Sequence, residues 1–148
     1  MSSEVPTTLH ASGLSPSQIE QMTQAATSAA ANAYAPYSHF YVGAAILLES
    51  GAILSGCNVE NASYRLTTCA EQTAIATAVA QHGPDIRIRA VVVVNRNGGV
   101  PCMPCGACRQ TILEFASPEC WVFYPSEGGV TTNASFTSLL PAAFHLAR

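Results

Sequence analysis

Residues 90–94 are Ala90-Val91-Val92-Val93-Val94, and this stretch decides the fold class. β-Branched residues favour strands. An apolar run without polar alternation is typical of a strand that is buried on both faces. The pattern therefore predicts a sheet whose two faces are both covered by helices.

Turn and cap signals place further elements before this strand. Ser15, Pro16 and Gln18 stand at the N-cap, N1 and N3 positions of a helix start. We expect that helix to run to about residue 34, because Pro36 cannot continue it. Two apolar strands follow, at residues 40–49 and 52–58, and a two-residue turn joins them into a hairpin.

Helical and strand patterns alternate after the hairpin. The further predicted elements are a helix over 68–82, a strand over 87–95, a helix over 105–116 ended by Ser117-Pro118, a strand over 120–124, a short strand near 130–132 and a short helix near 136–140. The last strands should run parallel through right-handed crossovers. The sequence predicts an α/β protein, a three-layer α/β/α sandwich on a mixed five-stranded sheet. We expect residues 1–14 to form a flexible arm and residues 15–148 a single domain.

Charge is scarce in this chain of 148 residues. Charged residues make up 10%, against a typical share of about 25%, and the net charge is −3. This balance argues against a nucleic acid polymer or an anionic membrane as partner. It also suggests self-association. The first ten residues lack Lys, Arg and a long apolar run, so we expect a cytoplasmic protein.

Two short motifs at predicted helix N-termini concentrate the reactive side chains. They are Thr68-Cys69-Ala70-Glu71 and Pro104-Cys105-Gly106-Ala107-Cys108. Side chains tilt toward the start of a helix, and the helix dipole favours thiolates there. Three thiolates with a fourth position open form a catalytic zinc site, which lowers the pKa of bound water toward about 7. Glu71 is the only carboxylate in either motif and could move the proton.

Each motif alone has a simpler interpretation. Glu71 stands three residues after Thr68, which is the spacing of a capping box. Cys105 and Cys108 also fit a thiol–disulfide oxidoreductase. Cys102 could complete a closed four-thiolate zinc site in a non-catalytic binding module. The capping box and the oxidoreductase each leave one of the two motifs unexplained, whereas the closed site would join Cys69 to Cys102, Cys105 and Cys108.

Four motifs in order resemble the cytidine deaminases of the small, homotetrameric type. They are Pro36-Tyr37-Ser38-His39-Phe40-Tyr41-Val42-Gly43-Ala44-Ala45, Gly56-Cys57-Asn58-Val59-Glu60-Asn61-Ala62-Ser63-Tyr64, and the two cysteine motifs, the second continuing into Arg109-Gln110. The combination of a cysteine, a Glu and Pro-Cys-x-x-Cys is the zinc deaminase signature. The resemblance implies hydrolytic deamination of cytidine and deoxycytidine to uridine and deoxyuridine in pyrimidine salvage.

The resemblance also implies a role for each matching residue. Cys69, Cys105 and Cys108 would hold one Zn²⁺ per chain, and Glu71 would move the proton. Six positions would contact substrate: Phe40 packing on the base, Asn58 and Glu60 binding the ribose, Tyr64 lining the pocket, Ala70 acting through its backbone, and Phe144 reaching a neighbouring subunit's site. Shared sites of this kind imply a homotetramer. Without the resemblance, Phe40 and Phe144 would be interpreted as core residues, and Asn58 and Glu60 as polar tips of a turn.

Two questions stay open within the resemblance. A deaminase of a cytosine-nucleoside antibiotic such as blasticidin S would keep the same motifs, although Asn58 and Glu60 suit an unmodified ribose. The family usually has Arg after Cys-Ala-Glu, whereas this chain has Gln72. Gln brings hydrogen-bond donors without a charge. We therefore expect weaker activation of zinc than in a Gln72→Arg variant.

Overall fold

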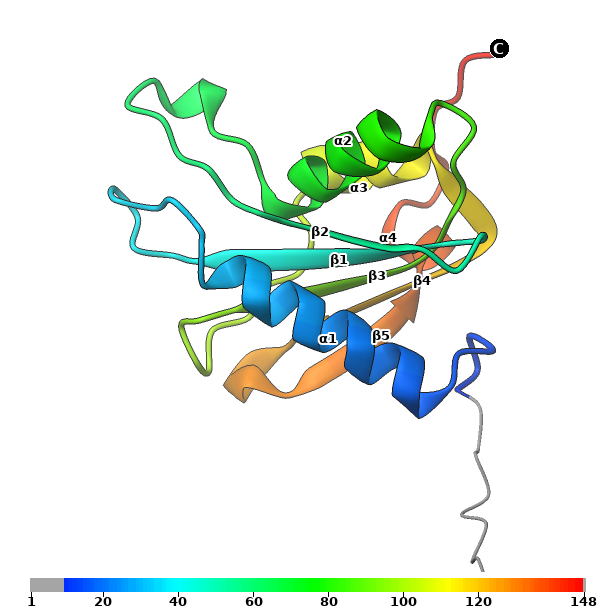
Figure 1. The fold of residues 1–148 in the computed structure, drawn as a ribbon, viewed down its shortest axis with the longest axis horizontal. Helices are drawn as coiled ribbons and strands as arrows, with labels where there is room; N and C mark the ends of the chain where they lie inside the picture. The colour runs from blue at the N-terminus through cyan, green and yellow to red at the C-terminus, as the bar shows by residue number, and fades with distance from the viewer. Residues whose placement is uncertain (1–9, 148) are drawn as a thin grey trace, which may run out of the picture.

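A five-stranded mixed sheet with the order β2-β1-β3-β4-β5 forms the middle layer of the protein (Figure 1). This computed structural model describes residues 10–147. The strands are β1 (Val42–Leu48), β2 (Ile53–Cys57), β3 (Ile88–Asn95), β4 (Ala116–Pro125) and β5 (Thr131–Ser135). The β3–β4 pair is parallel, and the other pairs are antiparallel.

Helices cover both faces of this sheet. They are α1 (Pro16–Ala30), α2 (Ala70–His82), α3 (Gly106–Leu113) and α4 (Phe136–Leu139), with single 3₁₀ turns at Tyr64–Leu66 and Glu127–Gly129. Helix α1 lies on one face, and α2 and α3 lie on the other (Figure 1). The predicted fold class is thereby confirmed.

Alternate residues of the central strands enter two separate cores. On β1, Ala44 and Ile46 pack toward α2, whereas Ala45 and Leu47 pack toward α1. Every residue of β1 is buried. On β3, the run of valines divides in the same way between the two cores. The continuous apolar pattern therefore reflects burial on both faces, as predicted.

The expected ends of α1 and α3 were wrong, as was the expected start of β4 at residue 120. Helix α1 ends at Ala30, not near residue 34, because Tyr34 bridges to Val59 instead of continuing the helix. Helix α3 ends at Leu113, and Pro118 lies within β4. The β3–β4 register is interrupted between the Ile88–Ala116 and Ala90–Trp121 pairs, so Pro118 occupies an irregularity where proline is tolerated.

The direction of the last strand also differs from the expectation. Strand β5 runs antiparallel to β4, because only residues 126–130 connect the two strands. A parallel connection needs a crossover of about a dozen residues or more. Only the β3–β4 pair, which α3 connects, fulfils the prediction of parallel strands.

Residues 10–14 belong to the folded body rather than to a free arm. Leu14 is fully buried beside Met22, and the His10 ring packs edge-on against Trp121 with centroids 5.1 Å apart. Residues 1–9 of the expected arm lie outside the described residues. Within residues 10–147, no helix is long and apolar enough to cross a membrane.

Glycine at position 43 allows α1 to lie directly on β1. A Cβ atom there would stand 1.9 Å from the Ala26 carbonyl oxygen and 2.7 Å from the Ala30 nitrogen. We expect Gly43→Ala to destabilise the protein by about 1–3 kcal/mol, the usual cost of overpacking. Thermal unfolding measures the effect. Gly98→Ala is the matched control, because its added methyl group meets nothing within 4 Å. Equal melting temperatures for the two variants would contradict the proposed close contact.

Candidate metal centre and substrate pocket

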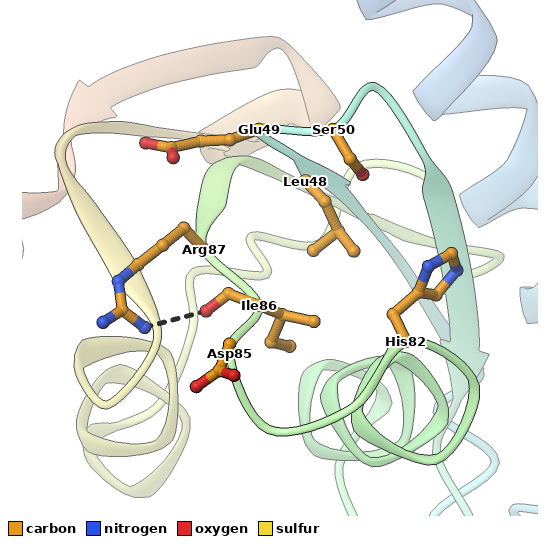
Figure 2. Close-up of a pocket in the computed structure, with 7 residues that line it drawn as sticks. All are labelled: Leu48, Glu49, Ser50, His82, Asp85, Ile86 and Arg87. Carbon is orange, nitrogen blue, oxygen red and sulfur yellow. Dashed lines mark hydrogen bonds between the residues drawn. The ribbon is translucent and has the colours of Figure 1, made fainter.

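Two hollows at opposite ends of α2 have similar volumes of about 240 and 270 Å³. The smaller hollow lies beyond His82, the last residue of α2, and contains charged side chains but no thiol (Figure 2). The larger hollow lies at the N-terminus of α2 and contains Glu71 and four cysteines. Reactive chemistry is therefore concentrated in the larger hollow, which we call the substrate pocket.

Three of the four thiols of this pocket lie at two helix N-termini. Cys69 is the N-cap of α2, and Cys105 is the N-cap of α3, with Cys108 in the first turn of α3. The Sγ of Cys105 accepts a hydrogen bond from the Cys108 backbone N–H at 3.4 Å. A cysteine at an N-cap takes the place of the usual Ser or Asp. The helix dipole therefore acts directly on these sulfur atoms.

The three sulfur atoms form one compact cluster. The Sγ atoms of Cys69, Cys105 and Cys108 all lie within 4.8 Å of one another. Sulfur ligands about 2.3 Å from a tetrahedral zinc ion stand about 3.8 Å apart. The donor set and its spacing therefore fit zinc with three protein ligands, which leaves one position for another group.

The hydrogen bond between the Cys69 and Cys108 thiols shifts their pKa values in opposite directions. A hydrogen bond from Cys108 lowers the pKa of Cys69 to about 7, and burial of Cys69 opposes that shift. The same pairing raises the pKa of Cys108. One sulfur of the pair is thus close to the thiolate form near neutral pH, which is the form that binds a metal.

Glu71 is buried beside the sulfur cluster and does not cap α2. Its side chain is 4% exposed, and its Oε2 accepts a hydrogen bond from the Cys108 thiol at 3.5 Å. Burial raises the pKa of this carboxyl. The N-cap of α2 is Cys69 and not Thr68, so Gln72 takes the N3 position of the capping box, where its Oε1 accepts the Cys69 N–H at 3.2 Å. The capping-box interpretation of Glu71 was therefore wrong.

Cys102 lies in the pocket but outside the cluster. It lines the pocket wall, yet it is not among the three cysteines that could hold one metal ion within residues 10–147. Burial raises the pKa of its thiol to about 12. The arrangement thus favours an open three-thiolate site over a closed four-thiolate site.

Four of the six expected substrate contacts line the pocket, namely Phe40, Asn58, Glu60 and Ala70. The Asn58 side chain donates to the Phe40 carbonyl at 2.8 Å. Glu60 accepts hydrogen bonds from the Tyr37 N–H at 2.9 Å and from the Ser38 hydroxyl. The Ser38 hydroxyl lowers the pKa of Glu60. The side chain of Ala70 is fully buried.

Two expected substrate contacts lie outside this pocket. Tyr64 is 73% exposed and touches Tyr37 edge-on, with ring centroids 6.0 Å apart. Phe144 is 65% exposed near the end of the chain. The fold of one chain brings neither ring to the pocket, so both roles stay predictions.

The pocket also contains residues that the sequence motifs did not single out. Ser38, Val42, Thr67 and Met103 line its wall. Ser38 and Val42 flank Phe40 at alternate positions, so strand periodicity could have identified them. Met103 stands two residues before Cys105, and only the path of the loop places it there.

Comparisons with known proteins agree on one family. Residues 16–124 match the family model described as the cytidine and deoxycytidylate deaminase zinc-binding region. Cytidine deaminase of Sporosarcina psychrophila is 40% identical over 126 residues, which cover 85% of this chain and 90% of that protein. Cytidine deaminase of Mycobacterium tuberculosis is 46% identical over 121 residues, which cover 82% and 85%.

Solved structures and a more distant relative extend this comparison. The crystal structure of the Mycobacterium tuberculosis cytidine deaminase superposes with a TM-score of 0.73 at 41% identity, covering 86% of this chain and 98% of that chain. Blasticidin-S deaminase of Bacillus cereus is 31% identical over 130 residues, covering 84% of this chain and 90% of that protein.

Loss of one sulfur should remove the metal. We expect the wild-type chain to hold about one zinc ion, and Cys105→Ser to weaken zinc affinity more than the 10- to 100-fold typical of residues that only support a ligand. Metal analysis after dialysis against a chelator measures this. Cys102→Ser is the matched control and should keep its zinc. Zinc loss from both variants alike would support the closed four-thiolate site instead.

Proposed function

Since the chain belongs to the zinc-dependent cytidine and deoxycytidylate deaminase family, we propose that it hydrolyses cytidine and deoxycytidine to uridine and deoxyuridine with release of ammonia. The observation that supports this most is the buried Glu71 carboxyl beside the three-cysteine cluster, in one pocket. We further propose that the enzyme works in pyrimidine salvage in the cytoplasm.

Different side chains of the protein have different roles in the reaction. When bound, zinc supplies Lewis acidity that makes water nucleophilic at neutral pH. Cys69, Cys105 and Cys108 hold the metal. Glu71 takes a proton from the attacking water and delivers it to ring N3. It then moves the second proton of that water from the new C4 hydroxyl to the amine, so that the C4–N bond breaks, ammonia leaves and the C4 carbonyl forms. Its raised pKa suits a group that must both accept and donate a proton.

The opposite part of the pocket suits a nucleoside. The Phe40 ring packs on the pyrimidine, and backbone groups of Ala70 contact the base. Glu60 remains a carboxylate at neutral pH because its pKa is lowered, so it accepts a hydrogen bond from a ribose hydroxyl. One N–H of the Asn58 amide donates to the Phe40 carbonyl, and its second N–H donates to the same sugar.

Removal of the Glu71 carboxylate should abolish turnover without loss of the metal. We expect Glu71→Gln and Glu71→Ala to lower kcat for cytidine by at least about 10²- to 10⁴-fold, the usual contribution of a general acid–base. Loss of the cytosine absorbance band and release of ammonia measure turnover. Exposed Glu119 offers the matched control, Glu119→Gln. Near-normal turnover by a zinc-replete Glu71→Gln variant would contradict the mechanism.

A deaminase of a cytosine-nucleoside antibiotic is the second candidate, because one relative is a blasticidin-S deaminase. Glu60 at the pocket wall favours an unmodified ribose instead. Turnover of blasticidin S in the presence of excess cytidine separates the two candidates. A thiol–disulfide oxidoreductase would instead reduce insulin without zinc, and the third cysteine of the cluster argues against it.

We also propose a homotetramer with shared active sites. Four large apolar residues that lie near pocket residues in the sequence are exposed, namely Tyr34, Tyr37, Val59 and Tyr64. The Tyr37 and Tyr64 rings touch, and the backbones of Tyr34 and Val59 form a β-bridge. Exposed apolar side chains that gather on one surface are typical of a region that another protein covers. Phe144 is an exposed aromatic residue that could reach the pocket of a neighbouring subunit.

A shared site predicts a defect in substrate binding when Phe144 is truncated. We expect light scattering to give four times the mass of the chain, and Phe144→Ala to raise KM for cytidine about 10-fold with its zinc retained. Leu146→Ala, also at an exposed position near the C-terminus, should keep a near-normal KM. A fully active monomer would contradict the shared site.

A further inference from the structure

The segment that leads from the turn at residues 36–38 into β1 contains two residues of the substrate pocket. Ser38 and Phe40 line the pocket, and His39 between them has a φ of +55°. The left-handed region is unfavourable for a residue that has a Cβ atom. The His39 N–H donates to the Ala35 carbonyl at 3.0 Å, and further contacts also stabilise this conformation. The conformation sets the direction of the chain on either side of His39.

Asn97, in the loop after β3, makes such contacts. Its Nδ2 donates to the His39 carbonyl oxygen at 2.9 Å, and its Oδ1 accepts the Tyr41 N–H at 3.2 Å. One side-chain amide thus pairs with two alternate residues of the segment, as the backbone of an adjacent strand would. The backbone N–H of Arg96 adds a bond to the Tyr41 carbonyl at 2.9 Å.

Asn58 holds the opposite edge of the same segment. It bonds the Phe40 carbonyl at 2.8 Å and the Val42 N–H at 2.9 Å. The two asparagines follow β2 and β3, the strands on either side of β1. They therefore continue the sheet's pairing beyond the strand ends, and residues 39–42 are bonded from both edges.

The segment also carries the link between the base-packing ring and the ribose-binding carboxylate. The Ser38 hydroxyl accepts the Phe40 N–H at 3.0 Å and donates to Glu60 Oε1. A change in the backbone at His39 would move both Ser38 and Phe40. Asn97 itself is not among the residues that line the pocket.

We propose that Asn97 is a positioning residue for substrate binding: it holds His39 in the left-handed conformation and thereby fixes Phe40 and the Ser38–Glu60 pair in the pocket. The inference rests on the proposed function, because it takes the nucleoside as ligand. The three thiols and Glu71 are supplied by α2 and α3. Loss of Asn97 should therefore affect KM more than kcat.

The test compares Asn97→Ala with a double variant in which residue 39 is a glycine and adopts a positive φ without strain. Asn97→Ala should raise KM for cytidine about 5-fold, the factor that corresponds to one typical hydrogen bond, with kcat within about 2-fold of wild type and zinc unchanged. Glycine adopts a positive φ freely. Adding His39→Gly to Asn97→Ala should therefore reverse at least about half of the rise in KM. A general loosening of the fold would predict no such recovery.

Two further variants complete the comparison. His39→Gly alone should keep a near-normal KM, because Asn97 still holds the segment. The control Asn133→Ala makes the same change on β5, at the far edge of the sheet, and should leave KM unchanged. Thermal unfolding of each variant shows that the comparison is made on folded protein.

Three results would overturn the inference. The first is an unchanged KM in Asn97→Ala. The second is a fall in kcat together with a loss of zinc in that variant, and the third is a double variant whose KM stays as high as that of Asn97→Ala. Failure of the proposed function is distinguishable, because it would appear in the zinc-loaded wild-type chain as no turnover of cytidine. That result would overturn both proposals, since no nucleoside would then be positioned.

Discussion

The convergence of two helix N-termini on one point is the arrangement on which the rest of the site depends. Cys69 begins α2, and Cys105 and Cys108 begin α3, so three sulfur atoms come within 4.8 Å only because these helices pack side by side on one face of the sheet. Gly56 of β2 makes this possible at α2, since a Cβ there would lie 2.4 Å from the Ala74 nitrogen. A close helix–sheet contact thus sets the position of a metal ligand.

Burial of Glu71 follows from the same packing. Glu71 is the second residue of α2, and its side chain is buried against Cys108 of α3. Burial removes most of the solvation of this carboxyl, which raises its pKa. Gln72 satisfies the backbone N–H of Cys69, so Glu71 is free for chemistry.

The substrate side of the pocket has a different physical basis. It is built from loops beyond the ends of β1, β2 and β3, where regular strand pairing has stopped. Side-chain amides of Asn58 and Asn97 replace the missing backbone partners, and Ser38 connects Glu60 to the same segment. A loop that is bonded in this way can present Phe40 in a fixed orientation, as nucleoside recognition requires.

The sequence by itself determined the layers of the fold, because an unbroken valine run needs helices on both faces. It also predicted the three cysteines that cluster and the Glu71 beside them, because these residues lie in short local motifs. The direction of β5 was decided by the short connection between β4 and β5, and the end of α1 was decided by the Tyr34–Val59 bridge. The structure showed that Gln72, not Glu71, is the side chain that accepts the N-cap N–H of α2. Only the tertiary structure decided that Cys102 lies outside the sulfur cluster and that Asn97 bonds His39. Asn97 and His39 stand 58 residues apart, so no local pattern connects them and only the packing of the whole chain brings them together.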